Sequence, residues 1–599
     1  MIKRDEPEKY YKDSLNNLKL KLKRIKGKEL ILSFSKIFLI IIICFFIINY
    51  KSYSIYPFLA LSVSLLIISI FHESIIKKKK ILIALKKVDE TELNIIDGKF
   101  KELYNGSEFI DIEHNYSDDL DLFGDGSLFQ YINRATTNMG RKTLANWLLN
   151  RADVSVVENR QKAVIELLKH NDFRKKIQIH GDKNEDNSSS MKKFIDFFNT
   201  PIEFTSNKLL FVMVKVVPVL TIISLYLGFT GFPFYVFFSL FLFQLSFNLV
   251  YEKKNSAIYN LSKKSYKILK AYSKIIEEIE NNEFESGRLD YLRKKLYPNK
   301  KKASYYIKRL AILLEWFELR SSSIHFFVNN IFFWDINIVF SIEKLRASIA
   351  DSVKTWFDVL GEIEVLSGFA TLYYNNPDWS MPKFDKDALL KAEHLGHPLI
   401  NRDERIVNDI LIDKGGKIII ITGPNMAGKS TFLRTIGVNI VLAQAGAPVC
   451  CNNFLLSPVD IYTSMKISDS LDKKMSLFYA ELSRLKKIID GLKSKKKIFF
   501  LIDEMLKGTN VMDRQKGSLA LMKQLIDNGA NGILATHDLK LSDLEKDYKE
   551  NDKKSEKILN FHFDSYIKGD LLEFDYKLKR GVCRSFNAHI LMKSMGIDV

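Results

Sequence analysis

The sequence predicts a multidomain chain with helical transmembrane hairpins, an all-α middle region and a C-terminal α/β domain. Three observations support this fold class. Four apolar runs occur in two closely spaced pairs, at residues 31–50 and 55–71 and at residues 209–227 and 233–250. Outside these runs, apolar residues recur at helical spacing. Near the C-terminus, a run of isoleucines leads into a glycine-rich loop, which is typical of an α/β domain.

Composition and charge limit the possible partners. With 599 residues, the chain is long enough for several domains. Its 90 Lys and Arg residues outnumber 71 Asp and Glu residues, and the net charge of +19 favours a polyanionic partner, either nucleic acid or an anionic membrane surface. Basic residues beside membrane segments also set topology, so charge leaves both partners open. The cysteines lack metal-ligand and disulfide-framework spacing, which is typical of a reducing cytosol.

The N-terminal segment, residues 1–110, is basic and contains the first predicted membrane hairpin. Residues 1–29 are lysine-rich and predict a helical lead. The runs 31–50 and 55–71 are each close to the ~20 residues that a helix needs to span a bilayer. Lysines crowd both outer ends of the pair, whereas the link has one, and this predicts that both ends lie in the cytoplasm. We expect no cleavable signal peptide, because the first run starts late and lacks a small-residue cleavage site.

Residues 205–254 contain the second predicted hairpin, with spans at residues 209–227 and 233–250. No charged residue occurs from residue 216 to residue 251, and basic residues lie on both sides of the pair. These features again predict a hairpin with cytoplasmic ends. For both pairs, buried helices of a large soluble domain are the alternative.

Helical periodicity marks the two regions beside the second hairpin. Residues 118–190 predict the first part of a helical core, in which Asn138-Met139-Gly140 separates two helices. Residues 255–383 alternate apolar and charged residues and predict long solvated helices, which can pair as levers. Within them, the apolar patch 324–340 predicts a core helix of a soluble domain, because its polar residues are costly in lipid. These polar residues are Asn329, Asn330, Asp335 and Asn337.

The C-terminal region, residues 384–599, contains a strand, a glycine-rich loop and a helix in succession. Residues 418–421 predict a buried strand, and the residues from Thr431 predict a helix. The loop consists of Gly423, Pro424, Asn425, Met426, Ala427, Gly428, Lys429 and Ser430. The backbone N–H groups of such a loop close on phosphates, and the helix N-terminus adds partial positive charge. We therefore expect Lys429 to contact the β- and γ-phosphates of ATP and Ser430 to bind Mg²⁺.

Two acids and a histidine complete the predicted site. Asp503 and Glu504 follow an apolar strand, residues 498–502. A phosphate loop needs one group to hold the metal and another to activate water. Asp503 is therefore predicted in the outer coordination sphere of Mg²⁺ and Glu504 as the general base. A third strand, residues 532–536, ends at His537, which we expect near the γ-phosphate or the attacking water; a structural histidine is the alternative.

Four motifs of the C-terminal region occur in the order and spacing of the MutS family of ATPases. They are GPNMAGKST (423–431), SDSLDKKMSLFYAEL (468–482), LIDEMLKGTN (501–510) and ATHDLKL (535–541). Upstream, the segment from residue 127 to ENRQKAV (158–164) resembles the start of the family's helical core, and HPLI (397–400) resembles its entry to the ATPase domain. The resemblance covers roughly residues 120–180 and 255–599 and leaves out both hairpins.

The resemblance implies an ABC-like phosphate-loop ATPase domain that traps ATP and Mg²⁺ between two subunits of a homodimer, with duplex or branched DNA as ligand. The residues that match the family's site are Gly423, Asn425, Gly428, Lys429, Ser430, Thr431, Asp503, Glu504 and His537. Ser476 matches the serine that a partner subunit presents to the γ-phosphate. Lys474 and Leu477 stand where the family has glycine and threonine, so communication between subunits is expected to differ, or Lys474 supplies a charge.

The family's mismatch-recognition wedge, Phe-x-Glu, has no counterpart before the core, where this chain has a membrane hairpin. We therefore expect a multi-pass protein of the cell inner membrane, with its core and ATPase domains in the cytoplasm and with membrane lipids as partners. Two alternatives stay open. One is a transporter-like ATPase, although the four predicted spans contain no acidic residue that could line a solute pathway. The other is a membrane tether in which ATP acts as a timer.

Overall fold

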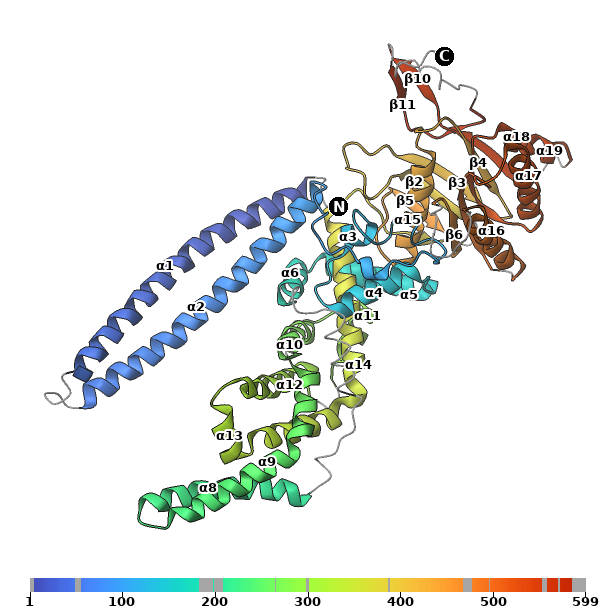
Figure 1. The fold of residues 1–599 in the computed structure, drawn as a ribbon. Coiled ribbons are helices and arrows are strands. Elements are labelled where there is room, and N and C mark those ends of the chain that lie inside the picture. Colours follow the sequence, from blue (N-terminus) through green and yellow to red (C-terminus); the bar gives the residue numbers. More distant parts are fainter. Residues whose placement is uncertain are drawn as a thin grey trace.

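A computed structural model gives the structure of the chain (Figure 1). It describes residues 5–48, 55–181, 198, 208–263, 265–297, 301–385, 388–466, 477–494, 496–551, 557–568 and 571–583. Most described residues are helical, and from residue 383 onward strands alternate with helices. The structure is therefore helical in its N-terminal and middle parts and α/β in its C-terminal part, as the sequence predicts.

The helical part consists of long helices and short connecting helices. In chain order these are α1 (Glu6–Ile48), α2 (Ile55–Ile96), η2 (Ser107–Phe109), α3 (Leu128–Ile132), α4 (Asn138–Leu149), α5 (Val154–Leu168), α6 (Asn171–His180), α8 (Lys208–Phe229), α9 (Phe234–Ser262), α10 (Ser265–Asn281), α11 (Gly287–Lys294), α12 (Ala303–Phe317), η4 (Glu318–Ser321), α13 (His325–Phe332) and α14 (Trp334–Asn375). Helix α14 runs from α13 toward the C-terminal sheets (Figure 1).

Helices α1 and α2 form an antiparallel hairpin that projects from the molecule (Figure 1). Both are longer than the predicted apolar runs, because their polar ends continue as helix and pack on the core. There Asp89 accepts a hydrogen bond from Ser14 (2.7 Å) and pairs with Lys175 (2.5 Å). Tyr11 donates to Asn375 of α14 (3.0 Å). The hairpin is thus attached to the core at its polar end, while its apolar end points away.

Four helices among the described residues, α1, α2, α8 and α9, are long and apolar enough to cross a membrane. In the most apolar 18-residue stretch of α1 and of α2, no residue is buried. In the corresponding stretches of α8 and α9, 28% and 11% of the residues are buried. Helices inside a soluble domain bury most of such a stretch. The structure therefore contradicts the alternative that these apolar runs are core helices of this chain.

The helical core packs around α14, which contacts α4, α5 and α12. Trp356 and most of the C-terminal half of α14 are buried, so the prediction of a long solvated helix is wrong for this element. The predicted break at Asn138-Met139-Gly140 is also wrong. These residues form the first turn of α4, and Thr137 caps it by accepting a hydrogen bond from the Gly140 N–H. The chain leaves helical geometry earlier, between α3 and α4.

The apolar patch 324–340 is not the single core helix that the sequence predicts. Phe333 adopts a left-handed conformation (φ 49°), and this residue ends α13 and begins α14 at an angle. Phe326 and Phe327 of α13 are more than half exposed, whereas the polar residues Asn329 and Asn330 are buried. The orientation of this patch is therefore the reverse of a soluble amphipathic helix.

The C-terminal part contains two sheets and a β-hairpin. Its elements are β1 (Lys383–Phe384), β2 (Ala388–Leu395), β3 (Asn408–Asp413), β4 (Ile418–Thr422), α15 (Lys429–Ala445), β5 (Asn453–Leu456), β6 (Asp460–Ser464), α16 (Leu477–Lys493), β7 (Ile498–Asp503), α17 (Val511–Asp527), β8 (Asn531–Ala535), α18 (Leu539–Ser542), α19 (Leu544–Asn551), β9 (Ile558–His562), β10 (Ser565–Lys568), β11 (Leu571–Phe574) and β12 (Lys579–Arg580). One sheet has the order β1-β5-β2-β3, and the other has the order β12-β9-β4-β8-β7-β6.

The six-stranded sheet forms the middle layer of this part. Strands β9, β4, β8, β7 and β6 are parallel, and β12 is antiparallel at the edge. Ile419 and Ile421 join the core that includes α15, whereas Ile418 and Ile420 join the core on the opposite face. A strand with both faces covered needs apolar residues at every position, which explains the isoleucine run. The carboxyl ends of β4, β7 and β8 meet at one edge, where the predicted site residues follow.

Candidate functional site

The loop between β4 and α15 makes a tight turn at the end of the sheet. Gly423 has a φ of 147°, and a Cβ added there would lie 2.7 Å from the carbonyl oxygen of Phe563. Gly428, just before α15, has a φ of 99°, and Met426 is left-handed without being glycine (φ 67°). Glycine is therefore required at the loop's closest approach to its neighbour. The loop directs the N-terminus of α15 toward the cavity described below.

Lys429, the first residue of α15, folds back over the loop. Its ammonium group donates hydrogen bonds to the carbonyl oxygens of Gly423 and Pro424, both at 2.8 Å, and lies 3.2 Å from Nε2 of His537. The residue is 6% exposed. Burial lowers the pKa of Lys429, and the nearby Asp503 and Glu504 carboxylates oppose this shift. Two hydrogen bonds thus hold the side chain in place at the mouth of the loop.

Ser430 and Asp503 meet across the end of the sheet. The Ser430 hydroxyl donates to Oδ2 of Asp503 at 2.5 Å. Asp503 ends β7 and is placed by its register with Ala535 of β8. A hydroxyl and a carboxylate oxygen are ligands that Mg²⁺ prefers, and Mg²⁺ takes few protein ligands when phosphates supply others. In the described part of the chain, no group of three or more His, Cys, Asp or Glu residues is placed to hold a metal. The pair therefore fits a magnesium ion shared with a phosphate.

Glu504 adopts a left-handed backbone (φ 61°) directly after β7. Its N–H donates to the carbonyl oxygen of Ala535 (2.9 Å), which fixes this unfavourable geometry. Such conformations cost about 1–3 kcal/mol and persist where the surrounding structure enforces them, often at functional sites. The left-handed backbone turns the Glu504 carboxylate toward Nζ of Lys507 (3.8 Å) and toward Nε2 of His537 (3.2 Å).

His537 lies between the carboxylate of Glu504 and the ammonium group of Lys429. Its Nε2 is 3.2 Å from Oε1 of Glu504 and 3.2 Å from Nζ of Lys429. Burial and the positive charge of Lys429 lower the pKa of His537. A neutral imidazole can donate from Nε2 or accept there, but not both. His537 can therefore hold either of its two neighbours in place at neutral pH.

These side chains line a cavity of about 710 Å³. Asn425, Met426 and Thr431 also face it, and apolar and aromatic side chains line it together with polar ones. Sequence reasoning missed three of these apolar residues, Ile406, Phe563 and Tyr576, because they come from separate segments and no local motif marked them. Phe563 and Tyr576 lie against the glycines of the loop. The cavity thus combines groups suited to phosphate and metal with apolar side chains.

A buried glutamate connects the site to helix α16. Glu481 is 1% exposed, and its carboxylate accepts hydrogen bonds from the N–H groups of Leu506 (2.5 Å) and Lys507 (3.0 Å), just after Glu504. Helix α16 begins at Leu477, directly after Ser476, which lies outside the described residues. A movement of α16 therefore reaches the loop that carries Glu504.

Asp119 of the helical region holds the segment that follows β6. Its carboxylate accepts hydrogen bonds from the Thr463 hydroxyl (2.7 Å) and from the N–H groups of Met465 (3.0 Å) and Lys466 (2.8 Å). It also pairs with Arg484 of α16 (3.0 Å). The helical core and the site are therefore joined through a buried, charge-assisted network.

His397 gives the α/β part a pH-dependent stability. Burial lowers the pKa of His397 from 6.5 to about 4, and Nδ1 accepts a hydrogen bond from the Leu399 N–H (3.3 Å), which needs an unprotonated nitrogen. Because the unfolded chain binds this proton more tightly, stability is lost as the pH falls from 6.5 toward 4, by up to about 3 kcal/mol. The unfolding temperature of the detergent-solubilised protein, measured across this window, checks the effect.

Two asparagine variants separate this effect from general acid instability. His397→Asn keeps an acceptor for the Leu399 N–H but has no titrating group, so it is expected to flatten the pH dependence. His394→Asn changes an exposed histidine near the end of β2 and is expected to leave the dependence unchanged. If the unfolding temperature falls equally with pH in the wild type and in His397→Asn, other groups cause the acid sensitivity.

Comparison with known proteins identifies relatives of the C-terminal region. The family model described as MutS domain V matches residues 419–597. The DNA mismatch repair protein MutS of Thermotoga maritima is 33% identical over 215 residues, which are 34% of this chain and 27% of the relative. The protein of that name from Thermotoga neapolitana is 30% identical over 269 residues, or 43% of this chain and 32% of the relative. The one from Persephonella marina is 26% identical over 261 residues, or 43% and 29%. The chain thus matches about a third or less of the length of these relatives.

Proposed function

Since its C-terminal region makes this chain a member of the MutS family, we propose that it is a membrane-anchored ATPase that binds DNA and couples ATP binding and hydrolysis to closure of a homodimer. One observation carries the proposal most directly. Lys429, the Ser430–Asp503 pair and Glu504 converge on one cavity at the carboxyl ends of three neighbouring strands. This is where α/β sheets bind ligands.

Each residue has a separate task in the proposed reaction. The loop N–H groups and Lys429 bind and orient the β- and γ-phosphates, and apolar side chains that line the cavity contact the base of ATP. Ser430 and Asp503 hold Mg²⁺, which neutralises charge on the phosphates when bound. Glu504 takes the proton of the attacking water, and His537 holds Glu504 or the water in position.

Dimer closure is supported by the connection between α16 and the site. Ser476 precedes α16, and the family resemblance has a serine there reaching the nucleotide of the partner subunit. Because Glu481 of α16 holds the backbone after Glu504, a partner that moves α16 also moves the general base. The Asp119 network carries the same movement to the helical core. Nucleotide state and core position are therefore coupled in the proposal.

Membrane anchoring is supported by the four exposed apolar helices. Figure 1 shows both hairpins projecting on the same side of the molecule, away from the C-terminal sheets. Lysines flank the outer ends of each hairpin, which favours a cytoplasmic position for the rest of the chain. We propose the cell inner membrane as the location, with lipids around α1, α2, α8 and α9.

DNA as the ligand rests on the relatives, which are named as DNA mismatch repair proteins, and on the net charge of +19. In the proposal, lysine-rich surfaces contact phosphates, so affinity is expected to fall steeply with salt, by about a thousandfold between about 50 and about 200 mM if about six phosphates are contacted. Duplex DNA is expected to raise the ATPase rate of the detergent-solubilised protein severalfold. Matched and mismatched duplexes are titrated in parallel, which measures whether the protein distinguishes them.

The measurement combines steady-state ATPase assays with salt titrations of duplex binding. Lys429→Ala serves as the control, because it removes the phosphate-binding cation and should abolish hydrolysis with and without DNA. An ATPase rate that DNA leaves unchanged, together with no salt-dependent DNA binding, would contradict the DNA-binding part of the proposal. That result would favour a transporter-like ATPase or a membrane tether.

A further inference from the structure

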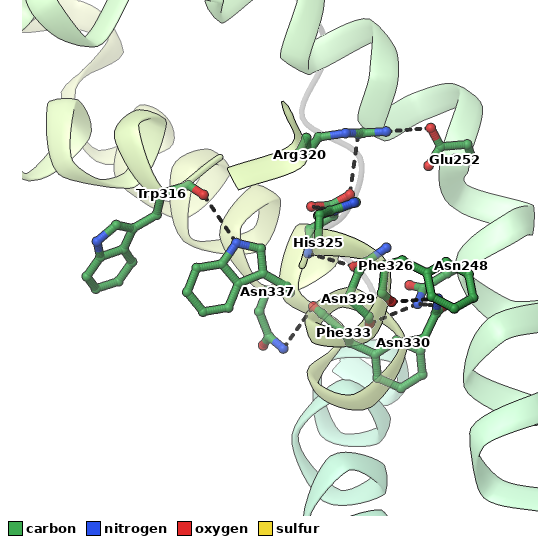
Figure 2. Close-up of polar contacts among 12 residues, drawn as sticks. Asn248, Glu252, Trp316, Arg320, His325, Phe326, Asn329, Asn330, Phe333 and Asn337 are labelled. Carbon is green, nitrogen blue, oxygen red and sulfur yellow. Dashed lines mark hydrogen bonds and ion pairs between the residues drawn. The ribbon is translucent and has the colours of Figure 1, made fainter. Parts of the chain in front are cut away.

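Helix α13 is attached to the side of α9, one of the four apolar helices. The side chain of Gln244 donates to the carbonyl oxygen of Ile331 (3.1 Å). The side chain of Asn248 donates to the carbonyl oxygen of Asn329 (3.0 Å) and to Oδ1 of Asn330 (2.9 Å), as Figure 2 shows. Three hydrogen bonds therefore hold α13 against α9.

These contacts place α13 at a definite depth along α9. At 1.5 Å per residue, Gln244 lies about 15 Å and Asn248 about 21 Å along the helix from Phe234. The hydrocarbon core of a bilayer is about 30 Å thick. If α9 crosses the membrane from Phe234, as the proposed function requires, both contacts fall inside the hydrocarbon core. Helix α13 then lies inside it as well, in the cytoplasmic half.

The face of α13 that points away from α9 is apolar and open. Ile324, just before the helix, is 56% exposed, and Phe327 is 59% exposed. Phe332, at the end of α13, is 42% exposed. This surface adjoins the exposed apolar side chains of α8 and α9, since α13 packs on both helices. The three helices thus present one continuous apolar surface.

Each asparagine of this patch makes a side-chain hydrogen bond within the protein, which lowers the cost of placing the patch in lipid. Oδ1 of Asn329 accepts from the Asp335 N–H (3.1 Å), and the side chain of Asn330 donates to the Phe326 carbonyl oxygen (2.8 Å). The side chain of Asn337 donates to the Phe332 carbonyl oxygen (2.9 Å). Polar groups are tolerated at membrane depth where the protein itself provides their partners.

Charged residues lie where the membrane surface is expected. Arg320 pairs with Glu252 of α9 and lies 3.4 Å from Asp335, which contacts His325 (2.9 Å; Figure 2). Glu252 is about 27 Å along α9 from Phe234, near the inner edge of the hydrocarbon core.

Two tryptophans lie beside this cluster. The Trp334 ring N–H donates to the Trp316 carbonyl oxygen (3.2 Å), and Trp316 is 52% exposed. Tryptophan is enriched at membrane–water interfaces. The order along α9 is therefore amides at depth, followed by charges at the surface.

We propose that α13 is a re-entrant helix that inserts its apolar face, formed by Ile324, Phe327 and Phe332, into the cytoplasmic leaflet beside α8 and α9. The proposal rests on the membrane anchoring of the proposed function. Phe333 joins α13 directly to α14, which runs to the core. In the proposal, the bilayer therefore fixes the N-terminal end of α14, the helix around which the core packs.

Three cysteine variants with similarly exposed positions test the insertion. Phe327→Cys reports on α13, Phe238→Cys on the span α9 (57% exposed) and Tyr291→Cys on the helical core (48% exposed). Each is made with Cys44→Ser in the full chain, where the other cysteines are buried, and is placed in lipid nanodiscs. Reaction with a membrane-impermeant maleimide is measured first. Quenching of a thiol-attached bimane by nitroxide groups on the lipid acyl chains is measured second.

Because the hydrocarbon core excludes water, we expect Phe327→Cys and Phe238→Cys to react with the maleimide at least about tenfold more slowly than Tyr291→Cys. We also expect the bimane labels at both of these positions to be quenched. If Phe238→Cys is protected and Phe327→Cys reacts as fast as Tyr291→Cys, the insertion is wrong and the anchor stands. If Phe238→Cys also reacts fast, the membrane anchoring itself fails, and the insertion with it. Protection of Phe327→Cys without quenching would mean that protein, such as a second copy, covers this face, and would overturn the proposal.

The hydrogen bonds of Asn248 supply a second test. In the Phe327→Cys background, Asn248→Ala removes two bonds between α9 and α13 and is expected to raise the labelling rate severalfold. Ser246→Ala is the matched control, since the Ser246 hydroxyl donates within α9 to Leu242. Equal labelling in the two variants would overturn the role of Asn248 in holding the inserted helix.

Discussion

Replacing Glu504 with glutamine is expected to lower kcat for ATP hydrolysis by roughly two to four orders of magnitude. The amide has nearly the shape of the carboxylate but cannot take a proton from water. The backbone at residue 504 stays in place, because its N–H is bound to Ala535. Lys429, Ser430 and Asp503 remain, so ATP is expected to bind as in the wild type.

Steady-state ATPase rates and equilibrium binding of a fluorescent ATP analogue separate these two effects. Glu277→Gln, which changes an exposed glutamate of α10, is the control for the substitution itself and is expected to retain full activity. Lys429→Ala is expected to lose nucleotide binding as well as turnover. A Glu504→Gln protein that hydrolyses ATP at most of the wild-type rate would refute Glu504 as the general base.

Replacing Glu364 with alanine is expected to destabilise the helical core by about 3–5 kcal/mol. The Glu364 carboxylate of α14 is 2% exposed and accepts hydrogen bonds from the N–H groups and hydroxyls of Thr136 and Thr137, at the N-terminus of α4. Burial raises the pKa of Glu364, and these donors oppose the shift. Alanine would leave the threonine donors buried without their acceptor.

The same contact explains a glycine in the core. A Cβ added at Gly140 would lie 2.4 Å from Oε2 of Glu364, so α4 can approach α14 this closely only with glycine at this position. Thermal unfolding in detergent and the rate of proteolysis measure the loss of stability. Asp351→Ala removes an exposed carboxylate from the same helix and is expected to change stability by less than about 0.5 kcal/mol. Equal unfolding temperatures for Glu364→Ala and Asp351→Ala would contradict the structural role of Glu364.

The most local features of this chain were predictable from its sequence. The strand before the glycine-rich loop, the helix after it and the strands that end at Asp503 and before His537 all occur where the sequence predicts them. The apolar helices of the two hairpins also occur in place. Each of these features depends on neighbouring residues in the chain. A buried central strand needs consecutive apolar residues, and a phosphate-type turn needs glycine at fixed positions.

Features that depend on distant residues were predicted wrongly or not at all. Asn138-Met139-Gly140 resembles a helix break, but Glu364 provides the partner that stabilises a helix start there. Phe563 and Tyr576 reach the cavity from other segments, so no motif marked them. The asparagines of α13 are bonded to Asn248 of α9, a partner that periodicity does not reveal.

The sequence by itself thus determined the order of the parts, the family of the C-terminal region and the residues gathered at the ends of three strands. Only the tertiary structure decided how the long α14 is buried, how Asp119 and Glu481 connect the core to the site, and which face of α13 is open. The physical reason is that the hydrogen bonds of a buried polar group are made across the fold. Whether such a residue breaks a helix, caps it or joins it to a neighbour depends on the helix that packs against it.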